Sequence, residues 1–409
     1  MEQYIKDQIT YGLKYLPKSL VKYNFIEKSS YETEKMKKAF IRGVCHPNEN
    51  YSQLKDASVE WVRIDIPFPF NNDGSLSEAY INFKKRAKGY RDNGIKIMAV
   101  TPYPSDFIEY GADIRTEQGT EKVREIARFL INDMQGFVNG FQVTNEMGIP
   151  RFTLPFTMSD AVKFIGVQLK EMYPYRKDII LGYNCAGPQA DLHVGLKEYY
   201  GYCDYIGIDI YMGCFFFGTM NMFDALLNYL WAMTKKPIIV QEFGYISGGK
   251  PKTAKEKSDV LKKYGAENEK EAKDNIESFV ENLNPRFKEY TKRICNNDKS
   301  RYYDFLFHSD MKDHLYCELP KTTVIPGYEH TPEGQAEFYK YILNHLYNKP
   351  FVAGTIIYCY QDSEKCYICG QSDCPVETRW GLVDLNGEPK PSYYAVKEEY
   401  TKIKEKSGN

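Results

Sequence analysis

The sequence contains no run of about 20 apolar residues, the length that a membrane-spanning helix needs. Positive and negative side chains nearly cancel, to a formal net charge of −1, so nothing in the charge favours nucleic acid or a membrane surface as a partner. No period recurs along the 409 residues, and 43% of them are hydrophobic, which excludes repeat arrays and intrinsic disorder. These absences leave a globular protein with one large domain or a few ordinary ones.

Residues 1–20 also lack the basic segment and the apolar run of a secretory signal. Unless the chain was trimmed, we therefore expect a cytoplasmic protein. Its ten cysteines are then expected to be free thiols, most of them buried, because the cytosol is reducing.

Short runs rich in Ile and Val alternate with longer amphipathic runs. The runs IKIMAV, DIILGY and PIIVQ do not alternate between apolar and polar residues, which is typical of parallel strands covered on both faces. Eight such strands separated by helical segments predict an α/β fold, a (β/α)8 TIM barrel. The expected strands cover residues 40–44, 61–66, 95–101, 140–144, 179–183, 205–211, 237–241 and 352–358.

A doubly wound open sheet is the rival fold, but it normally carries a glycine-rich phosphate turn after its first strand. Here His46 and Pro47 follow the first expected strand, without such a turn. We therefore divide the chain into an N-terminal helical extension (1–38) and a catalytic barrel (39–409). The barrel carries a large, mostly helical insertion after strand 7 (246–330) and a cysteine-containing loop after strand 8 (363–380).

The insertion is rich in Lys and Glu, with helical patches over residues 271–283 and 285–295. It follows a strand at the end of the barrel where barrel enzymes bind substrate, so one interpretation is a lid or a wall of the binding cleft. A solvated decoration or a contact between subunits is the other interpretation, and the sequence favours neither.

Two glutamates mark the expected carboxyl ends of strands. Glu146 follows strand 4 and Glu242 follows strand 7, so the two side chains would face each other across the mouth of the barrel. A carboxylate at the end of a buried strand is costly to desolvate unless it is used or paired. The pair suits cleavage of a glycosidic bond, in which a neutral carboxyl group donates a proton and an ionised one attacks the sugar.

Further segments accompany the two glutamates. Asn145 precedes Glu146, Arg63 lies in strand 2, Tyr211 ends strand 6, and the run 381–393 lies near the end of the chain. Together these motifs resemble the retaining β-glycosidases with TIM barrels, such as glycoside hydrolase family 5 and the barrel domains of family 2. The run 381–393 resembles the last loop and the start of the last helix in many of these enzymes. The resemblance covers roughly residues 39–401, and the exact family stays open.

The resemblance implies that Glu146 is the acid/base and Glu242 the nucleophile of a retaining hydrolase that forms a covalent glycosyl-enzyme. It also implies that Asn145 donates to the sugar 2-hydroxyl, that Arg63 keeps Glu242 ionised and that Tyr211 hydrogen bonds to Glu242. Read alone, Arg63 could be a structural ion pair and Tyr211 ordinary core. The implied substrate is an oligosaccharide or a glycoside, and the reaction requires no cofactor.

Tryptophan is scarce, with three residues against 35 tyrosines. Tyrosine offers a flat apolar face and a hydroxyl group, which suits a polar ligand that stacks. Tyr103, Tyr358 and Trp380 are candidate stacking platforms for a sugar ring, although aromatic residues also simply pack. His46, just after strand 1, is a candidate to bind a sugar hydroxyl or to be bonded within its own loop.

Cys366, Cys369 and Cys374 lie close together in the loop after strand 8. Their thiolates could share a tetrahedral zinc ion, although structural zinc sites typically show two cysteine pairs and this segment has one pair and a single cysteine. Free thiols, or a disulfide in an exported protein, are the alternatives. The fourth zinc ligand would be one of Cys359, Cys317 or His314.

Other functions of a barrel need different residues at the strand ends. A Schiff-base aldolase needs a lysine there, and none of the eight expected strands ends in one. A catalytically silent carbohydrate-binding barrel is the alternative outside the enzymes, but such a protein has usually lost one of the two carboxylates. The sugar, its linkage, endo or exo action and the oligomeric state stay open.

Overall fold

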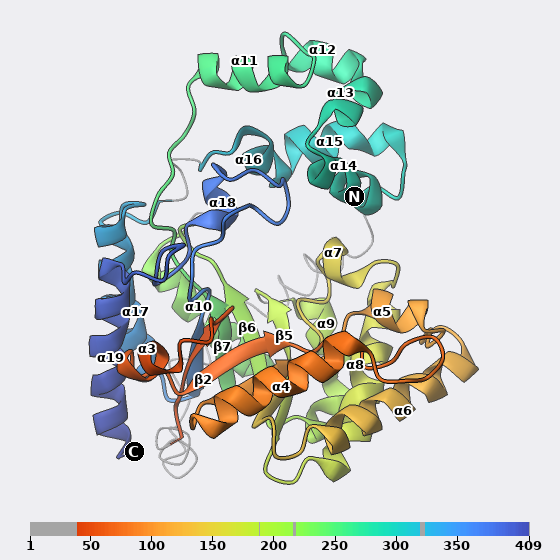
Figure 1. Cartoon of the computed structure of the whole chain (residues 1–409), viewed down its shortest axis with the longest axis vertical. Helices are drawn as coiled ribbons and strands as arrows, with labels where there is room; N and C mark the ends of the chain where they lie inside the picture. The colour runs from red at the N-terminus through yellow and green to blue at the C-terminus, as the bar shows by residue number, and fades with distance from the viewer. Residues whose placement is uncertain (1–38, 188, 216–217, 320–323, 409) are drawn as a thin grey trace.

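The computed structural model of the chain describes residues 39–187, 189–215, 218–319 and 324–408. The N-terminal helical extension predicted for residues 1–38 lies outside the described residues. A barrel forms the lower part of the molecule in Figure 1, and a group of short helices forms a lobe above it. Within the described ranges, no helix has both the length and the apolar character that crossing a membrane requires.

Eight parallel strands form a closed barrel in which each strand pairs with its neighbours in sequence and β8 pairs with β1. The predicted TIM barrel is therefore confirmed. Most strand boundaries agree with the sequence within one or two residues. The strands are β1 (Ile41–Cys45), β2 (Trp61–Asp65), β3 (Lys96–Val100), β4 (Gly140–Val143), β5 (Ile180–Ala186), β6 (Tyr205–Ile210), β7 (Ile238–Phe243) and β8 (Val352–Ile357).

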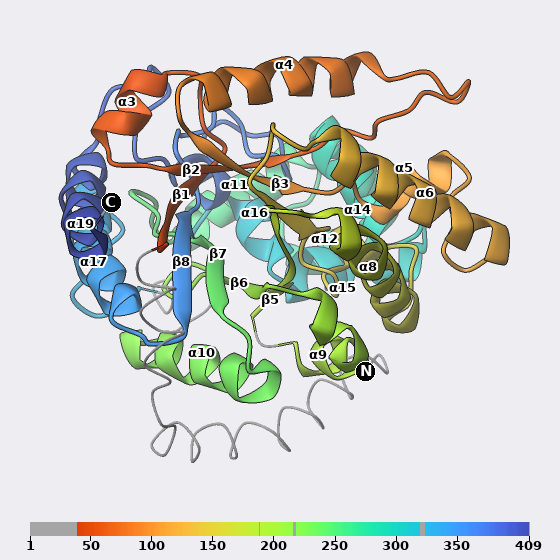
Figure 2. The same cartoon turned by 90° about the horizontal axis from the view of Figure 1, so that it is seen from below.

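The helices between the strands bury one face against the barrel and surround it (Figure 2). In α8 (Met158–Met172), the Thr157 side chain caps the N-terminus, and Phe164, Ile165 and Leu169 are buried at helical spacing. The other helices outside the lobe are α3 (Tyr51–Asp56), α4 (Glu78–Asp92), α5 (Pro104–Glu109), α6 (Glu117–Asp133), α7 (Pro150–Thr153), α9 (Ala190–Gly195), α10 (Met220–Thr234), α17 (Pro332–Tyr347), α18 (Pro375–Thr378) and α19 (Pro391–Ser407), of which α7 and α18 lie at the end of the barrel that faces the lobe.

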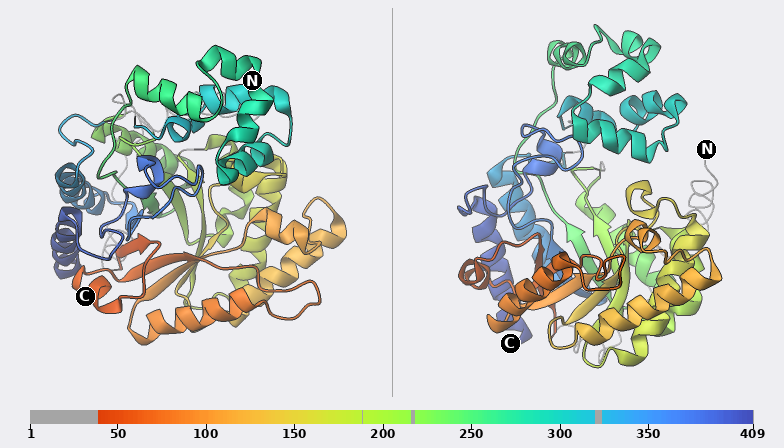
Figure 3. Two further views of the ribbon diagram at one scale, coloured as in Figure 1. Left: turned by 45° about the horizontal axis from the view of Figure 1, so that its top comes forward. Right: turned by 45° about the vertical axis from the view of Figure 1, so that its right-hand side comes forward.

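In the described part of the chain, six short helices that follow β7 form the lobe, which both views of Figure 3 show standing beyond one end of the barrel. Phe279, Phe287 and Leu306 of the lobe are fully or almost fully buried, and they belong to the same apolar cluster as the residues that pack around the barrel. The helical patch expected over 271–283 is divided at Asn275, whose φ of −120° and ψ of 35° lie outside the helical range. The helices are α11 (Ala254–Lys263), α12 (Glu269–Asp274), α13 (Ile276–Asn282), α14 (Pro285–Ile294), α15 (Tyr302–His308) and α16 (Met311–Tyr316).

The inside of the barrel changes character along its axis. Tyr205, the first residue of β6, reaches across to Met98 on β3, where its hydroxyl lies 3.2 Å from the sulfur. These two residues belong to a buried cluster that also contains Ile41, Trp61 and Ile356. Toward the carboxyl ends of the strands, buried polar side chains replace this apolar packing, namely Arg63, Gln142, Asn184, Asp209 and Gln241. The apolar cluster closes one end of the barrel, and the polar groups face the other.

Candidate active site

Glu146 stands on a short loop after β4 that the surrounding side chains hold in an uncommon backbone conformation. Thr144 and Glu146 have φ angles of 53° and 43°, in the left-handed region, which costs about 1–3 kcal/mol for each residue. The Glu146 N–H donates to Asn184 Oδ1 at 2.9 Å, and the Thr144 N–H donates to Thr101 Oγ1 at 2.8 Å. Bonds to β5 and to the end of β3 thus fix the direction of the Glu146 side chain.

Glu242 lies within β7, one residue before its end, and both of its carboxylate oxygens are bound. Arg63 Nη1 on β2 donates to Oε1 at 2.6 Å, and the Tyr211 hydroxyl donates to Oε2 at 2.5 Å. The pKa of Tyr211 is raised well above its ordinary value, first by burial and then by the charge of Glu242, so the phenol stays protonated and donates. The carboxylate is therefore held in one orientation from two sides.

Arg63 also connects Glu242 to the loop that carries Glu146. Its Nη2 donates to Asn145 Oδ1 at 2.6 Å, and its Nε donates to Gln142 Oε1 at 2.7 Å. Asn145 Oδ1 accepts further hydrogen bonds from Asn184 Nδ2 at 2.8 Å and from Gln142 Nε2 at 3.0 Å. With its oxygen used in this way, Asn145 has its NH2 group to offer to a ligand.

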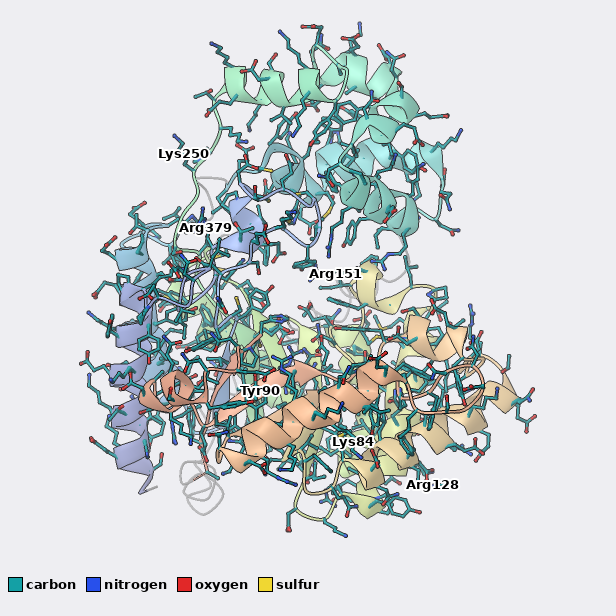
Figure 4. All side chains as sticks on the ribbon, in the orientation of Figure 1. Lys84, Tyr90, Arg128, Arg151, Lys250 and Arg379 are labelled. Atoms are coloured by element: carbon teal, nitrogen blue, oxygen red, sulfur yellow. The ribbon has the colours of Figure 1, made fainter. Side chains whose placement is uncertain are left out.

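Glu146 and Glu242 line the same cavity, of about 400 Å³, at the carboxyl ends of the strands. Arg151, labelled in Figure 4, belongs to the wall that faces the lobe. A cavity of this size with a few polar groups is typical of a site for a small ligand. The lining residues are His46, Arg63, Asp65, Tyr103, Asn145, Glu146, Arg151, Phe152, Tyr211, Phe215, Glu242, Tyr358, Ser363, Tyr367 and Glu377.

The two glutamates differ in their electrostatic surroundings. Burial, followed by the negative charge of Glu242, raises the pKa of Glu146 to about 7. Asp209, on β6 beside Glu146, has its pKa raised well above the ordinary value by burial and by the charges of Glu242 and Glu146, and its Oδ2 accepts from Asn184 at 2.6 Å. Glu242, in contrast, is paired directly with Arg63. Burial and the neighbouring negative charges therefore favour the neutral form of Glu146, whereas Glu242 is bonded to a cation.

Arg151, on α7, is the second cation of the cavity. Its Nη2 lies 3.7 Å from Glu146 Oε2, and its Nη1 bonds to the hydroxyl of Tyr367 from the loop after β8. The charge of Arg151 lowers the pKa of Glu146 and so opposes, in part, the effect of burial. Any change in the position of this arginine would alter the proton affinity of Glu146.

Four residues were predicted to contact a sugar, namely Tyr103, Tyr358 and Trp380 by stacking and His46 through a hydroxyl group. Three of them, Tyr103, Tyr358 and His46, line the cavity. Tyr103 stacks on Phe152, with ring centroids 5.4 Å apart and an interplanar angle of 15°. Tyr358 and His46 meet edge to face at 5.3 Å. The Tyr358 hydroxyl also donates to Glu377 Oε2 at 3.4 Å, a long hydrogen bond.

Trp380 does not occupy the stacking position predicted for it. Its side chain is 0% exposed, and its ring packs edge to face behind Tyr211 at 5.2 Å and behind Tyr358 at 5.6 Å. Its indole N–H donates to the carbonyl of Val376 at 2.7 Å. A ring covered on all sides cannot meet a ligand, so Trp380 supports the tyrosines that face the cavity.

Sequence reasoning missed Asp209, Arg151, Tyr367 and Glu377. A signal for Asp209 was present, because residues two apart in a strand share a face and Asp209 is two residues before Tyr211. Arg151 and Glu377 stand on the four-residue helices α7 and α18, and Tyr367 lies in the loop between β8 and α18. Segments this short show no periodicity that tells which side chains turn toward the cavity.

The three cysteines after β8 also come together. The ligand atoms of Cys366, Cys369, Cys374 and His314 all lie within 4.8 Å of one another, and all four residues are buried. His314 is one of the three fourth ligands that the sequence left open. Cys359, another of them, is directed elsewhere, with its thiol 3.1 Å from the carbonyl oxygen of Gln361.

No protein-family model matches the chain, and no curated protein matches its sequence. Solved structures with the same fold include three glycoside hydrolases. The family 53 catalytic domain from Ignisphaera aggregans has a TM-score of 0.55 and 16% identity, over 88% of this chain and 96% of that one. A family 39 enzyme from Bacteroides cellulosilyticus has a TM-score of 0.53 and 15% identity, over 90% and 65%. The family 2 β-galacturonidase from Eisenbergiella tayi, bound to galacturonate, has a TM-score of 0.50 and 13% identity, over 89% and 51%.

The chain thus spans about half the length of the β-galacturonidase and nearly all of the family 53 domain. At these identities the comparisons concern the fold. This protein shares its barrel fold with these glycoside hydrolases, and that barrel was predicted from the eight apolar strands separated by helical segments.

Proposed function

We propose that this protein is a retaining glycoside hydrolase that cleaves β-glycosidic O-linkages by double displacement. The observation that carries the proposal is that Glu146 and Glu242 share one cavity in different electrostatic surroundings. Glu146 is buried, with its pKa raised to about 7, whereas Glu242 bonds to the permanently charged Arg63. A retaining mechanism needs such a pair, one carboxyl group protonated and one ionised.

In the first displacement, a carboxylate oxygen of Glu242 attacks the anomeric carbon as the bond from that carbon to the leaving oxygen breaks. Glu146 gives its proton to the leaving oxygen, and an ester between Glu242 and the sugar results. Because the ester is neutral, the charge that raises the pKa of Glu146 disappears. Glu146 then takes a proton from water, whose oxygen attacks the anomeric carbon and releases Glu242 as a carboxylate.

The neighbouring residues supply positioning. Asn145, whose amide oxygen is bound by Arg63, directs its NH2 group to the sugar 2-hydroxyl, a hydrogen bond that strengthens in the transition state. Tyr211 and Arg63 hold the two oxygens of Glu242. Tyr103 and Tyr358 form aromatic walls for the sugar ring, and His46 binds one of its hydroxyl groups.

The substrate class that we propose is a β-linked glycoside or a short oligosaccharide. The named neighbours support this class, since they include a β-galacturonidase and enzymes of families 39 and 53. The chemistry is carried by carboxyl groups alone and uses no cofactor. We also propose a cytosolic setting, which fits ten free and buried cysteines.

Hydrolysis of a panel of aryl β-glycosides tests the proposal, with Glu242→Ala as the decisive variant. We expect wild-type activity on at least one glycoside, its loss in Glu242→Ala, and its return with azide, which takes the place of the carboxylate and yields the α-glycosyl azide. Glu399→Ala is the matched control, because Glu399 is equally buried but lies on α19 outside the cavity.

Two results would contradict the proposal. Retained hydrolysis in Glu242→Ala would exclude this residue as the nucleophile, and an inverted product anomer from the wild-type enzyme, seen by NMR, would exclude double displacement. Binding of sugars without hydrolysis across the panel would instead identify a carbohydrate-binding barrel.

A further inference from the structure

The buried thiol and imidazole cluster joins two parts of the chain that are far apart in sequence. His314 belongs to α16 of the lobe, whereas Cys366, Cys369 and Cys374 belong to the loop that connects β8 to α18. In Figure 1, α16 and α18 lie beside each other where the lobe meets the barrel. Whatever the cluster binds would therefore connect the lobe to the barrel.

We propose that His314, Cys366, Cys369 and Cys374 bind a single structural Zn²⁺ ion that fixes the lobe to the loop after β8. The ion would take no part in the reaction on the sugar. The proposal of a zinc site can therefore be tested independently of the proposed glycosidase activity.

The distances fit a tetrahedral ion. Zinc binds thiolate sulfur at about 2.3 Å and imidazole nitrogen at about 2.0–2.1 Å, so a nitrogen and a sulfur on the same ion are about 3.6 Å apart. In the protein, His314 Nδ1 lies 3.4 Å from Cys366 Sγ and 3.9 Å from Cys374 Sγ. Three sulfurs and one nitrogen in closed coordination are a common ligand set of structural zinc.

The surroundings fit a group of bound thiolates. The Cys369 N–H donates to Cys366 Sγ at 3.4 Å, a bond that stabilises negative charge on the sulfur. A further cysteine, Cys317, directly follows α16, and its Sγ accepts from Gln371 Nε2 at 3.1 Å. Gln371 lies between Cys369 and Cys374 in the sequence, so this bond also joins α16 to the loop that carries the three cysteines.

A disulfide is a poorer explanation of the same cluster. It would join two sulfurs and leave the third thiol and the His314 ring buried together, where a thiol is only a weak hydrogen-bonding partner. All ten cysteines of the protein are free. A zinc ion would satisfy the four donors at once, because it binds three thiolates and a neutral imidazole.

The proposed ion would stabilise one wall of the cavity. Ser363, Tyr367 and Glu377, which line the cavity, flank the three cysteines in sequence, and Tyr367 contacts Arg151. The lobe holds the same loop from its other side, because Arg286 on α14 bonds to the carbonyl of Tyr367. The zinc ion would therefore affect the cavity only by holding the residues of this wall in place.

Elemental mass spectrometry of the full chain, expressed without a histidine tag, measures its zinc content and so tests the proposal. We expect about one zinc per chain in the wild type and a loss of at least tenfold in Cys369→Ser and Cys374→Ser. The matched control is Cys295→Ser, since Cys295 is a buried cysteine of the lobe outside the cluster, and it should keep the metal.

If the cysteine variants fail to fold, experiments on the wild-type protein alone can still test whether the site binds zinc. A mercurial reagent that modifies thiols should release the zinc to a chelating dye, and exchange for Co²⁺ should give the thiolate-to-metal absorption of a tetrahedral site. Wild-type protein without zinc after anaerobic reconstitution, zinc retained in both cysteine variants, or a mass that shows a disulfide among the three cysteines would each overturn the proposal.

Discussion

Arg63 on β2 donates a hydrogen bond of 2.6 Å to Glu242 on β7, across the inside of the barrel. Both side chains are buried, so their attraction is weakly screened by water. The other nitrogens of the guanidinium bind Gln142 and Asn145 at the end of β4. One planar cation therefore sets the relative positions of the groups on which the proposed chemistry depends.

Replacement of Arg63 by lysine should lower kcat/KM about 10- to 100-fold. Lysine keeps the charge but has no planar fork, so it cannot bind Glu242, Asn145 and Gln142 together, and a lost hydrogen bond to a charged group costs about 1.5–3 kcal/mol. Steady-state kinetics on an aryl glycoside measures the change. Arg42→Lys is the control, because Arg42 is also buried and ion-paired, to Glu60 at 3.1 Å, but lies near the start of β1. Equal losses in both variants would indicate a general effect on folding.

Tyr211→Phe should lower kcat about 10- to 100-fold with little change in stability. The substitution removes the 2.5 Å hydrogen bond to Glu242 Oε2 and keeps the ring that packs against Trp380. Tyr205→Phe, at the start of the strand that Tyr211 follows, is the matched control, since the Tyr205 hydroxyl donates to the carbonyl of Phe141 away from the cavity. A wild-type kcat in Tyr211→Phe would remove Tyr211 from the mechanism.

The activity of the wild type should fall as the pH rises above about 7, the value to which burial and Glu242 raise the pKa of Glu146. The activity of Glu146→Gln should no longer depend on pH in this range. On substrates with a poor leaving group, its rate should be about 10²- to 10⁴-fold lower than that of the wild type. Dinitrophenyl glycosides, which need no protonation, should still form the glycosyl-enzyme at a near-normal rate. A basic limb that persists in Glu146→Gln would belong to another group, for which Glu377, with a pKa raised by burial to about 7, is the first choice.

The same shift predicts a dependence of stability on pH. The Glu146 carboxyl has a pKa of about 7 in the folded protein against an ordinary 4.5, so the folded state holds a proton that the unfolded chain releases. Its contribution to stability is present below pH 4.5 and is lost as the pH rises to about 7. Glu146→Gln should therefore raise Tm over that of the wild type at pH 8 and have less effect at pH 4. A Tm difference that does not change with pH would contradict the assignment.

Trp380 and Tyr103 should respond differently to substitution. Trp380→Ala should destabilise the protein by about 3–5 kcal/mol, because it opens a cavity behind Tyr211 and Tyr358. Tyr103→Ala should raise KM about 2- to 10-fold through the loss of an aromatic wall, with a smaller effect on Tm. The free energy of unfolding in denaturant and the KM, both measured for Trp380→Ala, Trp380→Phe and Tyr103→Ala, separate a packing role from a ligand-binding role. A raised KM with unchanged stability in Trp380→Phe would restore Trp380 as a ligand-binding residue.

The barrel was predictable because each strand is a short apolar run that needs cover on both faces, as in residues 95–101. The end of β7 was predicted less well. The strand continues to Phe243, so Glu242 lies within it, since the bonds to Arg63 and Tyr211 compensate the burial of its charge. Likewise, the helix expected over 271–283 is two helices, because packing within the lobe overrides local propensity.

The eight strands, and the positions of Glu146 after β4 and of Glu242 near the end of β7, could be read from the chain, because hydrophobic patterning is a local property. That Trp380 is covered, that Arg151 faces Glu146, and that His314 of the lobe lies among three cysteines after β8 depends on tertiary packing. These contacts join segments that are far apart in the sequence, and their separation along the chain does not tell how close they lie in space. Packing between the lobe, the loops and the barrel brings them together, and no pattern within a single segment encodes that packing.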